Sequence, residues 1–354
     1  AYKKAGGVHN WSEFTVDEQN GIAFIPFGTA RFDFYGGDRV GNNLFANSLV
    51  ALDARTGKRL WHYQLVHHDL WDYDLPQAPK LLTLKQNGRN IDVVAQATKY
   101  GFVFVFERKT GKPVFPIEER PVPQTDVPGE VTSPTQPFPM KVPPFARQSF
   151  TEKDINPHIP VAEQERLRQL LRNTRNEGLF TPPSLEGSIS LPGHNGGANW
   201  GSTAVDPTKG ELFVVAKNMP TLDRLVLSSD EPTAGVGGGL SPIVTAEQKA
   251  KLMAEAKAAA AKGPVRYTSP YDFMQSPTNG MTAIGPPWSE ITAYDLNTGE
   301  IKWRIPDGGV TAPADANIPA NTGAHMPRGG PLATAGGLLF VATLHVGLTI
   351  KLAV

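Results

Sequence analysis

The segment His67–Pro76 combines three carboxylates and two imidazoles with large apolar side chains. A buried strand cannot hold that many carboxylates without partners, and a surface loop has no need of so much apolar bulk. The combination is typical of the rim of a cavity, where a few polar groups face a ligand and aromatic groups hold them in place. The alternative is a solvated acidic loop that Trp71 anchors to the body of the protein.

The side chains of this segment are compatible with several kinds of chemistry. Paired carboxylates such as Asp69 and Asp72 could serve a hydrolase, or one of them could act as a general base. His67 and His68 could bind a metal, although neighbouring histidines in a loop more often form hydrogen bonds. His194 lies in a second, glycine-rich loop that could approach a cofactor. The spacing of these residues alone leaves the choice open.

Composition narrows the class of protein. The chain has 354 residues and equal numbers of basic and acidic side chains, 34 of each, which argues against a nucleic-acid-binding protein. No apolar run is long enough to span a bilayer. Cysteine is absent, so disulfides, thiolate catalysis and Cys-ligated metal sites are excluded. The 35 glycines and 32 prolines indicate many turns and a body rich in β-strands.

Two patterns recur along the chain and indicate the elements that position these residues. A spacing of Asp-x-x-x-Gly-x-x-x-Trp occurs at 53–61 and 295–303, and a weaker copy with Glu and Phe at its ends occurs at 107–115. Each copy predicts a strand, a tight turn in which glycine takes a positive φ, and a second strand that presents an aromatic side chain. A turn followed by an apolar strand recurs at 17–25 and 206–214.

The two patterns alternate, which predicts small antiparallel sheets repeated in series. We therefore expect an all-β protein with the β-propeller fold, of which this chain holds three full four-stranded blades and part of a fourth. An ordinary antiparallel sandwich with similar hairpins is the alternative. Insertions interrupt the repeats at about 120–195 and 222–287. They contain a proline-rich extended loop over 120–160, a helix over 161–177, and an exposed helix over 245–262 that begins with a capping box.

The repeats and several motifs resemble the quinoprotein dehydrogenases that use pyrroloquinoline quinone (PQQ). The chain is similar to their membrane-bound glucose dehydrogenase branch, which includes quinate and other polyol dehydrogenases. The Asp-Gly-Trp hairpins resemble the tryptophan-docking motif that joins neighbouring blades of that family. Further matches, in the order of the family, are 35–37, 66–72, 134–138, 178–184 and 329–331. The resemblance extends from about residue 8 to 344.

The resemblance implies roles for particular residues. Asp72 matches the general base of the family, and Lys99 matches the lysine that hydrogen-bonds the quinone oxygens. Trp11 matches the indole that lies flat against PQQ, and Asn218 matches a PQQ-contacting asparagine, with Lys217 as the alternative if the register shifts by one. Without the resemblance, Asp72 would be interpreted as a turn carboxylate, Lys99 as solvated and Trp11 as part of the core.

The resemblance also implies an eight-bladed ring, a sugar or polyol substrate, ubiquinone as electron acceptor, and a periplasmic enzyme associated with the inner membrane. A Ca²⁺ or Mg²⁺ ion is implied too, with ligands outside this chain, so we assign no metal ligand here. A non-catalytic β-propeller scaffold is the competing hypothesis. Residues 1–7 resemble a vector-derived linker and 345–354 diverge from the family. Several PQQ-binding residues of the family also lie outside this chain, so we expect the isolated chain to bind PQQ poorly or not at all.

Overall fold

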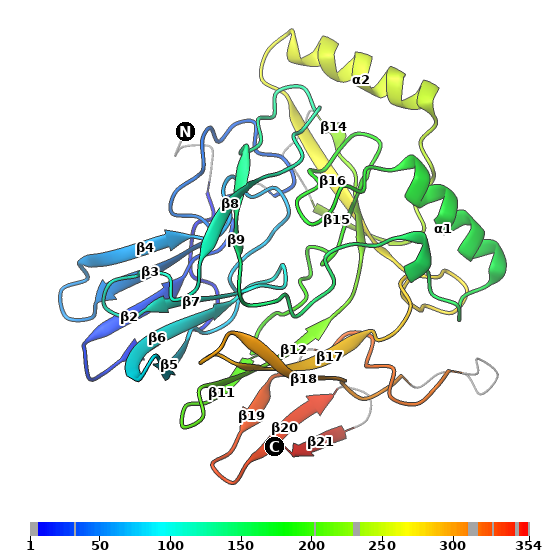
Figure 1. Cartoon of the computed structure of the whole chain (residues 1–354). Coiled ribbons are helices and arrows are strands. Elements are labelled where there is room, and N and C mark those ends of the chain that lie inside the picture. Colours follow the sequence, from blue (N-terminus) through cyan, green and yellow to red (C-terminus); the bar gives the residue numbers. More distant parts are fainter. Residues whose placement is uncertain are drawn as a thin grey trace.

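The computed structural model describes residues 6–31, 33–201, 203–228, 234–310, 318–327, 329–343 and 347–352. Strands dominate these residues, and two longer helices lie in the insertions, as Figure 1 shows. The all-β prediction with helical insertions is therefore confirmed. No helix in the described part of the chain is both long and apolar enough to cross a membrane.

Four antiparallel sheets follow one another along the described chain. Within each sheet the strands are paired in the order in which they occur in the sequence. The first contains β1 (Thr15–Asp17), β2 (Ile22–Pro26), β3 (Ser48–Asp53) and β4 (Arg59–Gln64). The second contains β5 (Lys80–Gln86), β6 (Arg89–Ala97) and β7 (Val103–Glu107). The third contains β11 (Thr203–Asp206), β12 (Glu211–Lys217), β17 (Ser289–Asp295) and β18 (Glu300–Pro306). The fourth contains β19 (Pro331–Ala333), β20 (Leu338–Thr343) and β21 (Gly347–Leu352).

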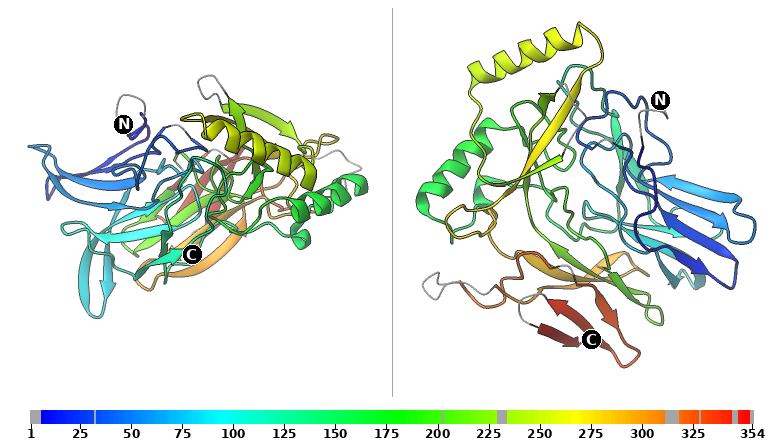
Figure 2. Two further views of the ribbon diagram at one scale, coloured as in Figure 1. Left: turned by 90° about the horizontal axis from the view of Figure 1, so that it is seen from above. Right: turned by 180° about the vertical axis from the view of Figure 1, so that it is seen from behind.

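The first strands of these sheets lie beside one another. β1 contacts β5, β5 contacts β11, and β11 contacts β19. The sheets therefore spread outward from a shared inner edge, an arrangement that the reader can follow in Figures 1 and 2. Radial repetition of antiparallel sheets is the arrangement of a β-propeller, which supports the predicted fold class over a sandwich of two sheets.

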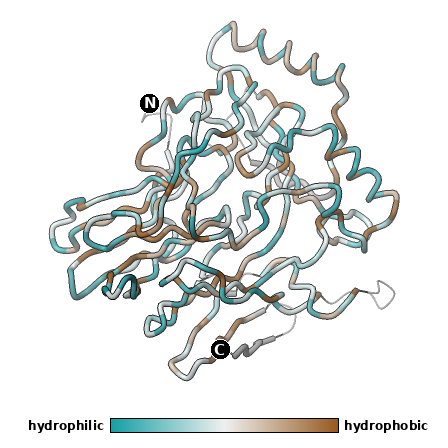
Figure 3. Tube along the Cα trace, viewed as in Figure 1, coloured by the Kyte–Doolittle hydropathy of each residue, from teal (hydrophilic) through white to brown (hydrophobic). Residues whose placement is uncertain are grey.

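A separate apolar core fills each space between neighbouring sheets. Phe24 and Phe104 belong to the core between the first and second sheets. Val105 and Leu212 belong to the core between the second and third sheets, and Val341 to the core between the third and fourth. Successive side chains of a strand point to opposite faces, so neighbours in β7 such as Phe104 and Val105 serve two cores. Figure 3 shows hydrophobic segments within the stack and hydrophilic hairpin tips.

Aromatic side chains of one repeat pack on the glycine turn of the next. A Cβ atom on Gly111 would lie 2.6 Å from the indole of Trp61, and one on Gly299 would lie 3.1 Å from the ring of Phe115. The indole nitrogen of Trp61 also donates a hydrogen bond of 2.8 Å to the backbone oxygen of Arg108. The recurring Asp-Gly-aromatic spacing therefore joins neighbouring sheets as well as closing its own hairpin.

The first insertion is more regular than the sequence predicts. β8 (Ile117–Pro121) pairs with β9 (Thr135–Pro139) inside the segment expected to be an extended loop. Proline is tolerated there because this sheet has only two strands, and both are edges. After a 3₁₀ turn, η1 (Glu152–Asp154), helix α1 (Val161–Asn173) ends earlier than predicted. Its continuation is prevented because Arg175 already pairs with Ser188 in the following sheet.

The two insertions together form a further sheet, and the second insertion adds a helix (Figures 1 and 2). The sheet contains β10 (Ser188–Ser190), β13 (Thr221–Asp223), β14 (Val226–Ser228), β15 (Ala234–Gly239) and β16 (Arg266–Met274). Helix α2 (Ala246–Ala260) begins with the predicted capping box, in which Thr245 accepts from the backbone nitrogen of Gln248. The helix is not wholly exposed, since Ala256 is buried and Leu252 packs against the same core.

Candidate active site

The His67–Pro76 loop is folded around a buried carboxylate. Asp69 is 1% exposed and accepts hydrogen bonds from the hydroxyl of Thr29, the amide of Asn47, and the backbone nitrogens of Trp71 and Tyr73. The last three of these bonds are each 2.8 Å long. A carboxylate that accepts this many hydrogen bonds fixes the backbone on both sides of residue 72. Asp69 therefore positions the loop.

Aromatic side chains anchor the same loop in the core. The indole nitrogen of Trp71 donates to the backbone oxygen of Thr181 at 2.7 Å, and the hydroxyl of Tyr73 donates to that of Pro192 at 2.9 Å. Both rings are fully buried. The predicted cavity rim therefore describes this loop better than the alternative of a solvated acidic loop.

Lys99 lies at the centre of the site and joins two carboxylates of the loop. It follows β6, and its ammonium nitrogen lies 2.9 Å from Oδ2 of Asp72 and 2.7 Å from Oδ2 of Asp74. The Lys99 side chain is 4% exposed, whereas a quarter of the Asp72 side chain, 25%, remains accessible. Asp74 also accepts a 2.7 Å hydrogen bond from the backbone nitrogen of Thr29. Asp72 is thus the more accessible carboxylate of the pair.

The pKa shifts separate the functions of the two carboxyls. Burial raises the pKa of Asp72 well above its ordinary value; Lys99 opposes this rise, and Asp74 and Asp33 add to it. Burial would also raise the pKa of Asp74, but Lys99 and a hydrogen bond with Asp72 hold it below its ordinary value. Burial would lower the pKa of Lys99, but the two carboxylates raise it above its ordinary value. The site therefore favours the charged forms of Lys99 and Asp74 and the neutral form of Asp72.

Trp11 forms a wall beside this cluster. The Lys99 nitrogen lies 5.6 Å from the centre of a Trp11 ring, and Trp200 meets that side chain edge-on, with ring centres 5.4 Å apart. Both tryptophans line a cavity of about 280 Å³ together with Glu13 and Pro76. The structure therefore brings Trp11 close to Lys99, which pairs with Asp72, and the functional roles of the three residues stay predictions.

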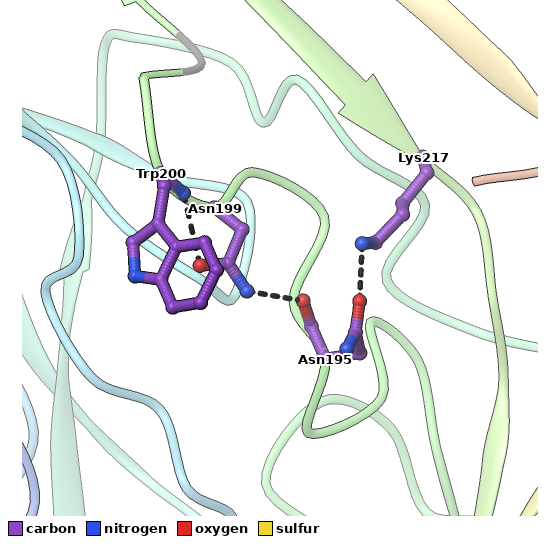
Figure 4. Close-up of a pocket in the computed structure, with 4 residues that line it drawn as sticks. All are labelled: Asn195, Asn199, Trp200 and Lys217. Atoms are coloured by element: carbon purple, nitrogen blue, oxygen red, sulfur yellow. Dashed lines mark hydrogen bonds between the residues drawn. The ribbon is translucent and has the colours of Figure 1, made fainter. Parts of the chain in front are cut away.

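A second cavity, of about 160 Å³, is lined by Asn195, Asn199, Trp200 and Lys217 (Figure 4). Lys217, and not Asn218, faces this space. The Asn218 amide is engaged with the backbone, since its oxygen accepts from the Arg147 nitrogen at 3.1 Å and its nitrogen donates to the Pro287 oxygen at 3.0 Å. Of the two residues, the cavity is thus lined by Lys217. A cofactor contact by Asn218 stays a prediction.

The histidines of the sequence analysis form hydrogen bonds or pack in the core. His67 lies 2.9 Å from a carboxylate oxygen of Glu119, and the buried His68 lies 2.9 Å from one of Glu130. His194 packs against Phe273, with ring centres 5.0 Å apart. Burial, Lys99 and Lys217 lower the pKa of His194 to about 3, so its imidazole is neutral. These histidines therefore support the loops around the site.

The described residues contain no group of three or more His, Asp or Glu side chains that could hold a metal ion. Lys99 lies between Asp72 and Asp74 and pairs with both carboxylates. The same residues fit a planar, anionic, carbonyl-bearing cofactor better. Trp11 offers an aromatic face, and Lys99 and Lys217 offer ammonium donors.

The sequence analysis missed several residues that the structure brings to the site. Asp74 was part of the acidic segment but received no role, although it is the nearest partner of Lys99. Asn195 lies in the glycine-rich loop of His194, and Asn199 and Trp200 follow directly after that loop. These amide and indole side chains close to a glycine-rich loop are the sequence feature from which the residues could have been predicted.

Comparisons with known proteins show the family of the chain. The family model described as "PQQ: Glucose/ethanol/alcohol dehydrogenase, beta-propeller domain" matches residues 1–346. The quinate/shikimate dehydrogenase (quinone) of Acinetobacter baylyi is 33% identical over 96% of this chain and 41% of its own length. The quinoprotein glucose dehydrogenase of Escherichia coli is 32% identical over 94% of this chain and 41% of its own length. The chain thus spans about two fifths of these relatives.

Solved structures share the fold at lower identity. A quinohemoprotein alcohol dehydrogenase from Pseudomonas putida superposes with a TM-score of 0.58 at 20% identity, covering 98% of this chain and 40% of that one. A europium-containing methanol dehydrogenase superposes with a TM-score of 0.59 at 18% identity, covering 98% of this chain and 45% of that one. These matches support the β-propeller class for the four sheets.

Proposed function

Because the chain belongs to the β-propeller family of PQQ-dependent glucose, ethanol and alcohol dehydrogenases, we propose that it oxidises a hydroxyl group of a sugar or polyol with PQQ as hydride acceptor. The observation that carries this proposal is the position of Lys99, 2.9 Å from Asp72 and 5.6 Å from a Trp11 ring centre. Relatives named for quinate, glucose and glycerol support a polyhydroxylated substrate.

The residues of this chain have distinct tasks in the proposed reaction. Bound PQQ supplies a planar quinone that accepts a hydride. Asp72 takes the hydroxyl proton from the substrate, a task that its accessibility and raised pKa suit. Lys99 directs its ammonium to the site as a hydrogen-bond donor where negative charge develops, and Asp74 fixes that ammonium in place. Trp11 supports the aromatic face of the cofactor.

The wider setting is part of the same proposal. The four sheets are consecutive blades of an eight-bladed ring, formed within a domain over 8–344, and other parts of the ring supply a Ca²⁺ or Mg²⁺ ion. Electrons pass to ubiquinone at the inner membrane, on its periplasmic side. The word "quinone" in the name of the Acinetobacter relative supports the choice of acceptor.

The test is the Asp72→Asn variant, made in a protein that carries this chain with its flanking coding sequence and loaded with PQQ and Ca²⁺. Polyol-dependent dye reduction should fall by about 10²–10⁴-fold, because a general base contributes that much. PQQ binding should persist, since Trp11 and Lys99 remain. Asp53→Asn, in an exposed turn, is the matched control and should leave the rate unchanged. Full activity in Asp72→Asn would refute the proposal.

A further inference from the structure

The first insertion contacts the His67–Pro76 loop at both of its histidines. In β9, the side chain of Gln136 accepts a 2.8 Å hydrogen bond from the backbone nitrogen of His67 and donates one of 2.6 Å to its backbone oxygen. In the connection between β8 and β9, a carboxylate oxygen of Glu130 lies 2.9 Å from Nε2 of His68. The insertion that interrupts the repeats therefore holds the start of the acidic loop.

Glu130 is a buried carboxylate, and both of its oxygens have hydrogen-bond partners. Oε1 accepts from the backbone nitrogen of Val131 at 2.9 Å and lies at the same distance from Nε2 of His68. Oε2 accepts from the backbone nitrogen of Gly36. Nδ1 of His68 donates in turn to the backbone oxygen of Gly41 at 2.7 Å, because a carbonyl oxygen only accepts. The side chains of Glu130 and His68 are 1% and 4% exposed, so these contacts are shielded from water.

Close packing keeps His68 beside Glu130. A Cβ atom on Gly36 would lie 2.7 Å from Nε2 of His68, and one on Gly37 would lie 2.3 Å from the backbone oxygen of Gly129. The two neighbouring glycines thus allow one backbone segment to fit between the histidine and the connection that carries Glu130. The imidazole is therefore confined by packing as well as by its hydrogen bonds.

The backbone of the acidic loop takes conformations that its residues do not favour. The φ angle is 46° at His68 and 59° at Asp72, in the left-handed region where residues other than glycine are uncommon. Such conformations persist only where surrounding contacts hold them. Asp69 supplies these contacts inside the loop, and Glu130 supplies them at its start. The position of the Asp72 carboxylate thus depends on both acidic side chains.

We propose that Glu130 is a positioning residue for the reaction: by holding His68, it keeps the loop in the conformation that directs the Asp72 carboxylate to the substrate. The insertion strands β8 and β9 and their connection then act as a clasp on the reaction site. This inference rests on the proposed function and adds to it a residue from outside the repeats. The clasp predicts that the rate depends on Glu130 although Glu130 does not touch the substrate.

The matched control lies in the same insertion. Glu119 of β8 pairs with the neighbouring His67 at 2.9 Å, but its side chain is 48% exposed. Water can replace an exposed partner of this kind, so its removal costs little. Glu130→Gln and Glu119→Gln therefore make the same chemical change at two adjacent histidines, one contact being buried and the other exposed.

The first measurement compares kcat and KM of these two variants in the PQQ-loaded protein that includes the flanking sequence, with quinate, glucose and glycerol as substrates. An amide has one acceptor oxygen, whereas the backbone nitrogens of Gly36 and Val131 donate to different oxygens of Glu130. In Glu130→Gln, kcat should fall by about 10–100-fold with KM within about twofold, because a displaced reacting group weakens the transition state and not substrate binding. Glu119→Gln should keep the wild-type kcat. A wild-type kcat in Glu130→Gln would overturn the inference.

The second measurement tests whether Glu130 acts through Asp72. In the Asp72→Asn background, Glu130→Gln should lower the remaining rate by less than about twofold, because the group that it positions is absent. An equal fall of kcat in both backgrounds would mean a general structural role and would refute positioning. Gly36→Ala is a second way to displace the imidazole, since its methyl group would press on Nε2 of His68, and it should lower kcat as Glu130→Gln does.

The third measurement does not depend on activity. In the PQQ-free protein, amide hydrogen exchange over residues 66–76 should be about tenfold faster in Glu130→Gln than in wild type, the effect of losing one hydrogen bond, and unchanged in Glu119→Gln. Unchanged exchange in Glu130→Gln would refute the clasp. If no polyol supports dye reduction in the wild type, the proposed function fails, and the exchange rates still decide whether Glu130 holds the loop.

Discussion

The spaces between the sheets and the site around Lys99 are assembled by different means. Between the sheets, contacts are apolar and repeated, with Trp61 packed on Gly111 and Phe115 on Gly299. At the site, contacts are polar and occur once, and they join Lys99 to Asp72 and Asp74. The site concentrates charge in a buried place, where the loss of one partner leaves another uncompensated.

The largest expected effect is the loss of the central cation of the site. Lys99→Met leaves the Asp72 and Asp74 carboxyls enclosed without their ammonium partner, and the free energy of unfolding should fall by about 3–5 kcal/mol. Urea denaturation at pH 7 measures this change. The double variant Lys99→Met/Asp74→Asn removes one charge of each sign and should recover part of the loss. A double variant no more stable than the single one would show that charge balance is not what Lys99 provides.

A smaller effect should follow from disturbing one interface between sheets. In Gly111→Ala the new methyl group would lie 2.6 Å from the Trp61 indole. Overpacking should therefore lower the free energy of unfolding by about 1–3 kcal/mol, in addition to the loss caused by placing alanine at a positive φ. Gly57→Ala is the matched control, because it has the same turn position and a φ of 70°, against 69° for Gly111, with open space around its Cβ. Equal melting temperatures for the two variants would contradict the docking role of the turn.

A buried carboxyl outside the site provides a comparison with Asp72 and Asp74, whose negative charge Lys99 compensates. Burial raises the pKa of Asp223 to about 6, and its hydrogen bond is to the hydroxyl of Ser190. In the unfolded chain this carboxyl loses its proton near pH 4, whereas the folded protein keeps the proton up to about pH 6. The free energy of unfolding therefore falls by about 2 kcal/mol as the pH rises from about 4 to 6. Asp223→Asn should remove this fall, so variant and wild type should differ more at pH 7.5 than at pH 4. Parallel pH profiles from urea denaturation would contradict this account.

The smallest effect is expected from an exposed ion pair at an interface turn. Lys141 lies 3.1 Å from Glu300, and both side chains are about half exposed or more, at 47% and 66%. Lys141→Met should change the free energy of unfolding by less than about 0.5 kcal/mol, because solvent screens such pairs. A loss comparable to that in Gly111→Ala would mean that charge, and not packing on glycine, holds the sheets together.

The fold was more predictable than the site. The recurring spacing at 53–61 and 295–303 contains its own turn chemistry, so the hairpins follow from local sequence. The β8–β9 pair was missed because proline usually interrupts strands, and nothing local signals that this sheet has two edges. Helix α1 ends early because Arg175 pairs with a strand that lies beyond it in sequence.

The site depends on contacts between distant parts of the chain. The family resemblance predicts roles for Trp11, Asp72 and Lys99, but no local pattern predicts that Asp74 would be the nearest partner of Lys99. The hydroxyl of Thr29 reaches Asp69, and Trp71 reaches Thr181, across long stretches of sequence. Such polar contacts have no periodicity, so they become visible only in three dimensions.

The most direct test of the central claim is a crystal structure of the PQQ-loaded protein. The account predicts that the quinone ring lies against the face of Trp11, with a quinone oxygen within hydrogen-bond distance of the Lys99 ammonium and Asp72 free to contact a bound polyol. PQQ bound elsewhere, with Trp11 and Lys99 untouched, would contradict the claim that these residues form one catalytic site.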